Sequence, residues 1–428
     1  MKVGIGKVDI TPSVGVELAG YGPFRERKST GIHDNLFCKA LYLEDEQEKA
    51  IIVVCDLISL ANKLVKETRE KISKKLNIEA EKILLAGIHT HSGPETGVYI
   101  GWGEPDKEYL SKLPDLILHA VEEAKENLKE VKVGIGTIKI DGEEISYNRV
   151  KEDVGVNNEI KVMKFVEKET EKHLCLILNY GAHAVVQGPA NTLISRDWPG
   201  KAVDIIKKET SFETMFFQGG CGDINSKPVT CKDPDEGFRE IERIGRYFAE
   251  KVIEEIDKIK VEDVEKFKNK SFRHFLPTNP IPENELEKVI EENEKILIEE
   301  KDENKKRTAK FQVQGAKAQL SFYKEKKDLY QMEIETQVIE INNAILITIP
   351  GELFVEFQRK LENCFPDKVV FTITYANGSI PYIPSKYDFQ VNGYASSFTP
   401  RILGVMPFRE DVGDVLIENI VDFIKNKF

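Results

Sequence analysis

Short apolar runs rich in β-branched and aromatic residues recur along the chain and predict buried β-strands. Such runs lie at residues 36–43, 50–55, 83–88, 132–139, 160–166, 174–180, 214–217, 332–349 and 369–375. The 332–349 run alternates apolar and polar positions around Asn342-Asn343, which predicts a β-hairpin. The charged segment between 36–43 and 50–55 predicts another hairpin with a longer loop.

Helical periodicity separates many of these strands. It covers residues 59–76, 107–126, 200–208, 235–258 and 410–427. A Glu- and Lys-rich stretch at 282–310 carries apolar residues at helical spacing and predicts an exposed helix, as one arm of a helical hairpin. Because strands and helices alternate over most of the length, we expect an α/β fold. We expect one domain, residues 1–428, with an inserted helical segment at about 260–330.

The composition narrows the function classes. The chain has 428 residues and a formal net charge of -12, which disfavours a nucleic-acid or anionic-membrane partner. No run of about 18 apolar residues is present, so we expect no stable membrane insertion. The N-terminus lacks the apolar core of a signal peptide, and the six cysteines show no framework spacing. These features predict a cytoplasmic protein with free thiols.

Polar or glycine-rich segments follow several of the predicted strands. They are His89–Pro94, Gly181–His183, Gln218–Asn225, Pro350–Glu352 and a segment that begins at Ala376 and reaches Tyr382. The carboxyl ends of strands in α/β sheets are where ligands bind. We therefore expect these segments to converge on one ligand site.

Histidines and one glutamate are the candidate chemical groups of this site. His89 and His91 are two residues apart, so on extended chain they face the same side, and His183 follows a different strand. Imidazoles in this arrangement indicate a metal centre or acid–base chemistry; the alternative is ordinary loop hydrogen bonding. Glu352 follows Pro350-Gly351, where a buried carboxylate needs a partner or a metal. Its alternative is a carboxylate at a helix N-terminus.

The glycine-rich segment Gln218–Asn225 has two interpretations. Its backbone N–H groups could form a cradle for an anion or an oxyanion. Alternatively, it is a tight turn in which Asp223 bonds its own backbone. It contains neither a P-loop nor a GxSxG motif, which leaves both interpretations open.

A series of short motifs runs from the first strand nearly to the C-terminus. They are VDITP (8–12), AGYG (19–22), GIHDNLFCKAL (31–41), HTHSGP (89–94), NR (148–149), NYGAHAV (179–185), SRDWPG (195–200), QGGCGDIN (218–225), IPGE (349–352) and a tyrosine-rich stretch at 375–394. In this order the motifs resemble neutral ceramidases and their bacterial relatives, in the large N-terminal catalytic domain. The resemblance implies a mixed-sheet α/β domain that holds one zinc ion and hydrolyses an N-acyl amide.

The resemblance also implies roles for individual residues. The implied zinc ligands are His89, His183, Glu352 and Tyr382. The implied catalytic groups are His91 as general base or acid, Arg149 and Tyr394 at the reacting carbonyl, and Asn225. Asn225 stands where the family has a serine. We expect His33, Asp197 and Gly220 at the substrate, where His33 and Asp197 would orient other groups.

These features lead to a functional hypothesis. The chain ends without the family's C-terminal β domain and shows no export signal, so ceramide itself is not the expected substrate. We expect a zinc-dependent hydrolase that cleaves an amide, or an ester, of a soluble polar small molecule through metal-activated water. The alternatives are a metal-dependent phospho- or sulfo-ester hydrolase and a non-catalytic sugar- or polyol-binding protein. A second copy of the chain is a candidate partner through the 282–310 helix.

Overall fold

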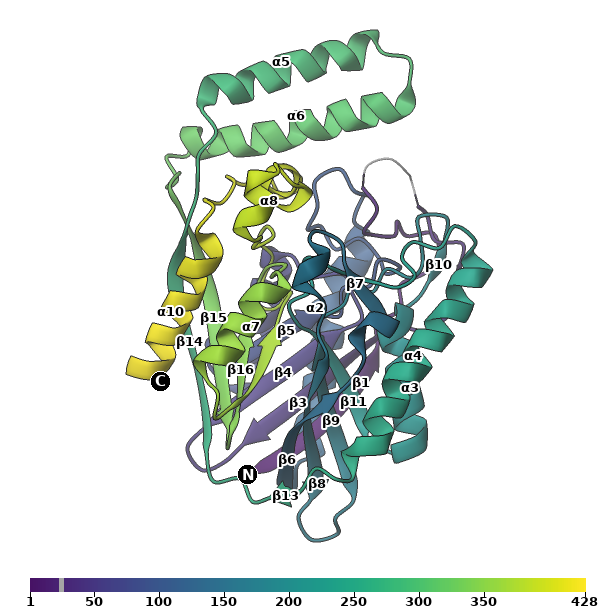
Figure 1. Cartoon of the computed structure of the whole chain (residues 1–428), viewed down its shortest axis with the longest axis vertical. Helices are drawn as coiled ribbons and strands as arrows, with labels where there is room; N and C mark the ends of the chain where they lie inside the picture. Colours follow the sequence, from purple (N-terminus) through teal and green to yellow (C-terminus); the bar gives the residue numbers. More distant parts are fainter. Residues whose placement is uncertain (23–26) are drawn as a thin grey trace.

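The larger of two main β-sheets forms the centre of the molecule (Figure 1). The computed structural model describes residues 1–22 and 27–428. The strands of this sheet are β1 (Lys2–Asp9), β3 (Phe37–Glu44), β4 (Lys49–Cys55), β5 (Ile83–Gly87), β6 (Lys129–Lys139), β8 (Glu159–Glu167), β9 (His173–Tyr180), β11 (Glu213–Gln218) and β13 (Val261–Glu262). Their order is β11-β9-β8-β6-β1-β3-β4-β5, with β13 beside β6. The pairs β4–β5 and β9–β11 are parallel and the other pairs antiparallel, so the sheet is mixed as expected.

The smaller sheet contains the predicted second hairpin. Its strands are β14 (Phe267–Pro277), β15 (Gln331–Ile341), β16 (Ala344–Thr348) and β17 (Val369–Ile373), in that order. Asn342-Asn343 joins β15 to β16, and Asn342 has the positive φ of 47° that such a tight turn requires. The hairpin prediction is therefore confirmed.

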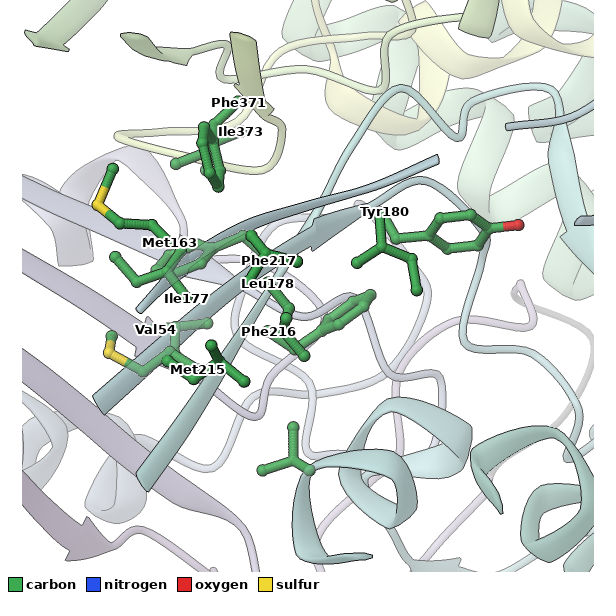
Figure 2. Packing of buried hydrophobic residues seen from close by; sticks show 14 of the residues in the cluster. Val54, Met163, Ile177, Leu178, Tyr180, Met215, Phe216, Phe217, Phe371 and Ile373 are labelled. Carbon is green, nitrogen blue, oxygen red and sulfur yellow. The ribbon is translucent and has the colours of Figure 1, made fainter. Parts of the chain in front are cut away.

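The two sheets pack face to face. Figure 2 shows Phe371 and Ile373 of β17 above Met163, Ile177 and Phe217 of the larger sheet. All five side chains are completely buried in one hydrophobic cluster. This contact explains why the strands nearest to it read as nearly continuous apolar runs, since both of their faces are covered.

Helices cover the outer faces of both sheets. On the larger sheet lie α1 (Asn62–Leu76), α2 (Lys107–Glu126), α3 (Asp197–Thr210) and α4 (Pro234–Ile256). On the smaller sheet lie α7 (Val355–Cys364) and α10 (Val412–Asn426). Each helix buries an apolar stripe, so the molecule has four layers: helices, two sheets and helices (Figure 1). None of the helices in the described ranges is both long and apolar enough to cross a membrane.

Short elements connect the layers. They are β2 (Gly31–Ile32) paired with β10 (Leu193–Ile194), β7 (Ser146–Asn148) paired with β12 (Ile224–Ser226), α8 (Lys386–Gln390), the π-helical turn η4 (Tyr394–Phe398), α9 (Thr399–Leu403), and single 3₁₀ turns at Ala80–Lys82, Gly142–Glu144 and Glu152–Val154. The sequence did not predict these elements, because two to five residues carry no clear periodic signal.

The inserted helical segment is shorter than we expected. The long strand β14 occupies part of the 260–330 range, and the helices are α5 (Glu283–Glu299) and α6 (Glu303–Lys324). The predicted 282–310 helix is therefore two helices, and Asp302 caps the second by accepting hydrogen bonds from two backbone N–H groups. The apolar stripe of α5 packs partly within the chain: Leu286 is buried against α6 and Met406, whereas Ile296 is 39% exposed.

The predicted ligand-binding edge is present. The β9–β11 and β16–β17 pairs are parallel, so their carboxyl ends point the same way within each pair. The amide of Thr374, after β17, donates to the carbonyl of Gln218 at the end of β11 (3.0 Å). The amide of Gly87, at the end of β5, donates to the carbonyl of Tyr375 (3.2 Å). These bonds bring segments far apart in the sequence to one place.

Candidate metal centre

Three imidazoles meet at this edge. The candidate ligand atoms of His89, His91 and His183 all lie within 4.8 Å of one another. His89 lies two residues after the end of β5. Its φ of 64° is a left-handed conformation that is unfavourable for a residue with a Cβ. The amide of His89 donates to the carbonyl of Leu57, and the amide of His183 donates to that of Ile224. The sequence prediction that these histidines converge is therefore correct.

Backbone carbonyls determine which ring nitrogen each of two histidines presents. Nδ1 of His89 lies 2.9 Å from the carbonyl of Ile58, and Nδ1 of His183 lies 3.0 Å from the carbonyl of Ile224. Because a carbonyl only accepts, Nδ1 carries a proton in both rings, and in the neutral form of each ring the lone pair is on Nε2. Burial lowers the pKa of His89 to about 3, so this imidazole is neutral at physiological pH.

Glu352 brings a carboxylate to the same atoms. Its Oε2 lies 3.2 Å from Nε2 of His183 and 3.7 Å from Nε2 of His89. Burial opposes the charged form of Glu352, but the two imidazoles and a hydrogen bond from Tyr382 hold its pKa below the ordinary value. Tyr382 also accepts a hydrogen bond from Nη2 of Arg149 (3.1 Å). A charged carboxylate thus lies buried beside two imidazoles and the Tyr382 hydroxyl.

These residues fit a bound cation. Oε2 of Glu352 lies 3.2 Å from Nε2 of His183, close enough for one bound cation to contact both atoms. Nδ1 of His91 is buried and has no hydrogen-bond partner among the described residues. Imidazole nitrogens with a carboxylate oxygen are the donor set that zinc takes in catalytic sites. The structure also brings His91 close enough to count as a candidate ligand, since its Nε2 is 3.1 Å from that of His89.

A cavity of about 150 Å³ opens over these groups. Its walls are Gly20, Tyr21, Ile58, His89, His91, Tyr99, Trp102, Arg149, His183, Val185, Asn225, Val229, Thr230, Glu352, Tyr382, Tyr394, Thr399, Ile402 and Leu403. Every predicted zinc ligand and every predicted catalytic residue is in this set. The cavity combines a few polar groups with aromatic and aliphatic walls, as small-molecule sites do.

The β7–β12 pair delivers two of the predicted catalytic residues. Asn225 lies opposite Tyr147 in this pair, and the amide of Arg149 donates to the carbonyl of Asp223 (2.8 Å). The Arg149 guanidinium also donates to the carbonyl of Gly222 (2.7 Å), which holds it beside Tyr382. Tyr394 begins the turn η4, is 44% exposed, and meets the Tyr382 ring edge to face.

The three residues expected at the substrate, His33, Asp197 and Gly220, do not line this cavity, and their role at the substrate stays a prediction. His33 stacks on Phe238 near the surface and bonds Asp34 through Nδ1. The Asp197 carboxylate is buried and accepts from the amides of Val186, Gln187 and Trp198. Asp197 therefore supports the segment that follows His183.

Gly220 lies in a loop whose backbone groups are already occupied. The amide of Gly220 donates to Oε1 of Gln358, and the amides of Gly219 and Gly222 donate to carbonyls. A Cβ on Gly222 would approach the Glu352 carbonyl oxygen to 2.7 Å. These glycines permit close packing beneath Glu352, so the anion-cradle interpretation is wrong and the tight-turn interpretation fits the structure.

Two residues at the site escaped the sequence prediction. Tyr375 contacts both His89 and Glu352. Gly20 has a φ of 107°, and a Cβ there would lie 2.4 Å from Nδ1 of His91, so only glycine fits. Tyr375 follows β17, so the argument from strand ends applies to it as well.

Comparisons with known proteins agree with this geometry. The family description "Neutral/alkaline non-lysosomal ceramidase, N-terminal" matches residues 1–236, which is more than half of the chain. The chain belongs to this ceramidase family. The neutral ceramidase of Drosophila pseudoobscura pseudoobscura is 24% identical over 241 residues, which cover 51% of this chain and 34% of that protein. That of Pseudomonas aeruginosa is 24% identical over 254 residues, which cover 52% and 37%.

Solved structures share the fold of this ceramidase-family chain. The crystal structure of neutral ceramidase from Pseudomonas aeruginosa matches with a TM-score of 0.76 at 20% identity, covering 98% of this chain and 73% of the other. A structure titled "Ceramidase complexed with C2" matches with a TM-score of 0.77 at 18% identity, covering 100% and 75%. The sequence matches thus cover about half of this chain and about a third of the relatives' length. The structural matches cover nearly all of this chain and about three quarters of the solved chains.

Proposed function

We propose that this ceramidase-family chain is a zinc-dependent hydrolase that cleaves an amide bond, or less favourably an ester bond, in a soluble polar substrate. The observation that carries the proposal is the approach of Glu352 to the Nε2 atoms of His89 and His183, all buried at the base of one cavity. The names of the relatives support an N-acyl amide as the bond that is cleaved.

The proposed ligands are His89, His183, Glu352 and Tyr382. Zinc held by such a set supplies a Lewis acid that generates a nucleophile from water near neutral pH. Tyr382 fits this set because it hydrogen-bonds Glu352 and lies beside the Arg149 guanidinium. A cation at this position also explains why a charged carboxylate is stable in a buried site.

The remaining polar residues of the cavity bind the substrate and transfer protons during the reaction. Nδ1 of His91 is buried and has no hydrogen-bond partner in residues 1–22 and 27–428, and burial lowers the pKa of His91, so the ring is neutral and able to accept a proton. The permanently charged Arg149 and the hydroxyl of Tyr394 would orient the substrate carbonyl and stabilise the negative charge that develops on its oxygen. Asn225 contributes an amide to the cavity wall but no nucleophile.

The alternative function, hydrolysis of phosphate or sulfate esters, receives less support from the structure. That hypothesis used the glycine loop as an anion cradle, and the backbone amides of Gly219, Gly220 and Gly222 are bonded within the protein. We also propose a reducing compartment, the cytoplasm, because the described cysteines are free thiols. A small molecule is the proposed partner; a second copy of the chain stays a candidate.

A substrate screen tests the reaction class. The zinc-loaded chain is assayed against N-acyl amines, carboxylic esters, aryl phosphates, aryl sulfates and glycosides, with His91→Gln as the inactive reference. The proposal predicts turnover of N-acyl amines that His91→Gln lacks. Turnover of only phosphates or sulfates would replace the proposed reaction, and zinc binding without any turnover would indicate a binding protein.

A further inference from the structure

Tyr375 lies behind the candidate metal centre, in a strained backbone conformation. It comes two residues after β17, is 2% exposed and has a φ of 53°, in the left-handed region that favours glycine. An aromatic residue in this region is unfavourable and persists only where the surrounding structure fixes it. His89, at the end of β5, is in the same region with a φ of 64°.

Neighbouring strands fix the strained segment on both sides. The carbonyl of Tyr375 accepts from the amide of Gly87, and the amide of Asn377 donates to the carbonyl of Leu85 (2.7 Å). The amide of Ala376 donates to the carbonyl of Ile349 (3.3 Å). Tyr375 thus joins the end of β5, which leads to His89, to the end of β16, which leads to Glu352.

The Tyr375 side chain contacts both of those residues. Its ring stacks on the His89 imidazole, with centroids 3.9 Å apart and planes 17° from parallel. Its hydroxyl donates to Oε2 of Glu352 (3.1 Å), the oxygen that approaches the two histidines, and lies 3.3 Å from Sγ of Cys221. One rigid side chain therefore sets the plane of an imidazole and the position of a carboxylate.

We propose that Tyr375 is a positioning residue that pre-organises His89 and Glu352 for zinc. The inference rests on the proposed function, because it concerns the same metal centre. Residues that hydrogen-bond or orient metal ligands typically raise metal affinity by about 10- to 100-fold, because the ligands then lose less freedom when the metal binds. The strained backbone is maintained because it places one side chain against two ligands.

The test is the zinc affinity of the native chain, of Tyr375→Phe, of Tyr375→Leu and of a control variant. It is measured by competition with a chromophoric chelator. Tyr375→Phe keeps the stacked ring and removes the bond to Glu352, whereas Tyr375→Leu removes both contacts. Tyr180→Phe is the matched control, since that hydroxyl is also buried but bonds the carbonyl of Asn157. Circular dichroism and thermal unfolding of the metal-free chains report any general loss of folding.

We expect zinc affinity to fall about 10-fold in Tyr375→Phe, further in Tyr375→Leu, and within about twofold of the native value in Tyr180→Phe. We expect this order of zinc affinities even where Tyr375→Phe and Tyr180→Phe lose the same amount of thermal stability. If the native chain binds zinc and both Tyr375 variants bind it equally well, the positioning role is overturned while the proposed function stands. If the native chain binds no zinc, the proposed function fails and the role of Tyr375 fails with it.

Discussion

At the scale of single residues, a backbone carbonyl at Nδ1 determines the chemistry of His89 and His183. Each carbonyl fixes the ring tautomer, so that Nε2 offers its lone pair toward Glu352. His91 lacks this arrangement: its Nδ1 is buried without a partner among the described residues. The three histidines are therefore not equivalent, and the difference supports ligand roles for two of them and proton transfer for the third.

His91→Gln separates these roles. Because the proposed metal is held by other residues, the variant is expected to bind zinc within a few-fold of the native affinity. It is expected to lose about 10²–10⁴-fold in kcat, the usual contribution of a general base. Zinc stoichiometry and steady-state kinetics on an N-acyl amine measure the two effects. Loss of the metal in His91→Gln would instead make His91 a ligand.

Asn225→Ala tests the wall residue at the position of the family serine. The Asn225 side-chain amide donates a long hydrogen bond, 3.5 Å, to the Tyr147 hydroxyl and supplies no nucleophile. We expect kcat/KM to fall by less than about 10-fold, as for the loss of one neutral hydrogen bond to the substrate. A complete loss of turnover at full zinc occupancy would show that Asn225 takes part directly in the reaction.

The sequence predicted the residues of the cavity better than it predicted those around it. His89, His183 and Glu352 follow strands that end at one edge, so their convergence was predictable from their position after apolar strands. His33 bonds the carboxylate of the adjacent Asp34 and stacks on Phe238, whereas Asp197 accepts from the backbone amides of Val186 and Gln187. Such contacts leave no pattern in the sequence. The packing of Gly220 was not predictable, because a glycine-rich turn has the same composition whether it packs tightly or binds an anion.

At the scale of elements, Glu95 organises the segment that carries Tyr99 and Trp102 into the cavity wall. Its Oε1 accepts from the amides of Gly97 and Val98, whereas its Oε2 is buried without a partner in the described part of the chain. Burial raises the pKa of Glu95 to about 7, from an ordinary value of 4.5. This loop is therefore coupled to proton binding.

The coupling predicts a pH dependence of stability. The native state holds the Glu95 proton more tightly than the unfolded chain, so its contribution to the free energy of unfolding falls between pH 4.5 and about 7. The slope is at most about 1.4 kcal/mol per pH unit. Urea unfolding of the native chain and Glu95→Gln at pH 5 and pH 8 measures it, with the exposed Glu108→Gln as control. The native chain should lose more stability than Glu95→Gln between these pH values; an equal loss would contradict the assignment.

Helix α6 supports another wall of the cavity. Gly315 of α6 packs so closely on α9 that an added Cβ would lie 2.4 Å from the carbonyl oxygen of Arg401. The next residues of α9, Ile402 and Leu403, line the cavity, and the amide of Ile100 donates to the carbonyl of Ile402. A larger residue at position 315 must therefore displace this wall.

Gly315→Val is the corresponding test. We expect a destabilisation of about 1–3 kcal/mol, typical of overpacking, and a KM that rises more than kcat falls. Lys317→Ala, exposed on the same helix, should change neither parameter beyond experimental error. Thermal unfolding and Michaelis–Menten analysis measure both effects. A native KM in Gly315→Val would show that α6 does not shape the cavity.

At the scale of the whole molecule, the α/β class and most strands and helices were predictable from periodicity, whereas the arrangement of the layers was not. The pairing of two sheets depends on which faces of buried strands meet, and strands covered on both faces give no alternating signal. Strand β14, inside the expected helical segment, alternates charged and partly buried positions that read as polar surface. The N-terminal part of the α5 stripe packs on α6 and Met406, whereas Ile296 and Ile298 near its C-terminal end are exposed.

The central claim is that this fold brings distant segments together to hold one zinc ion, and metal content tests it most directly. The native chain, Glu352→Ala and the control His33→Ala are purified without chelator, supplied with zinc, desalted and subjected to elemental analysis, with circular dichroism to confirm folding. We predict about one zinc per chain in the native protein and in His33→Ala, and much less in folded Glu352→Ala. A native chain that takes up no zinc, or a Glu352→Ala variant that retains it fully, would contradict the account.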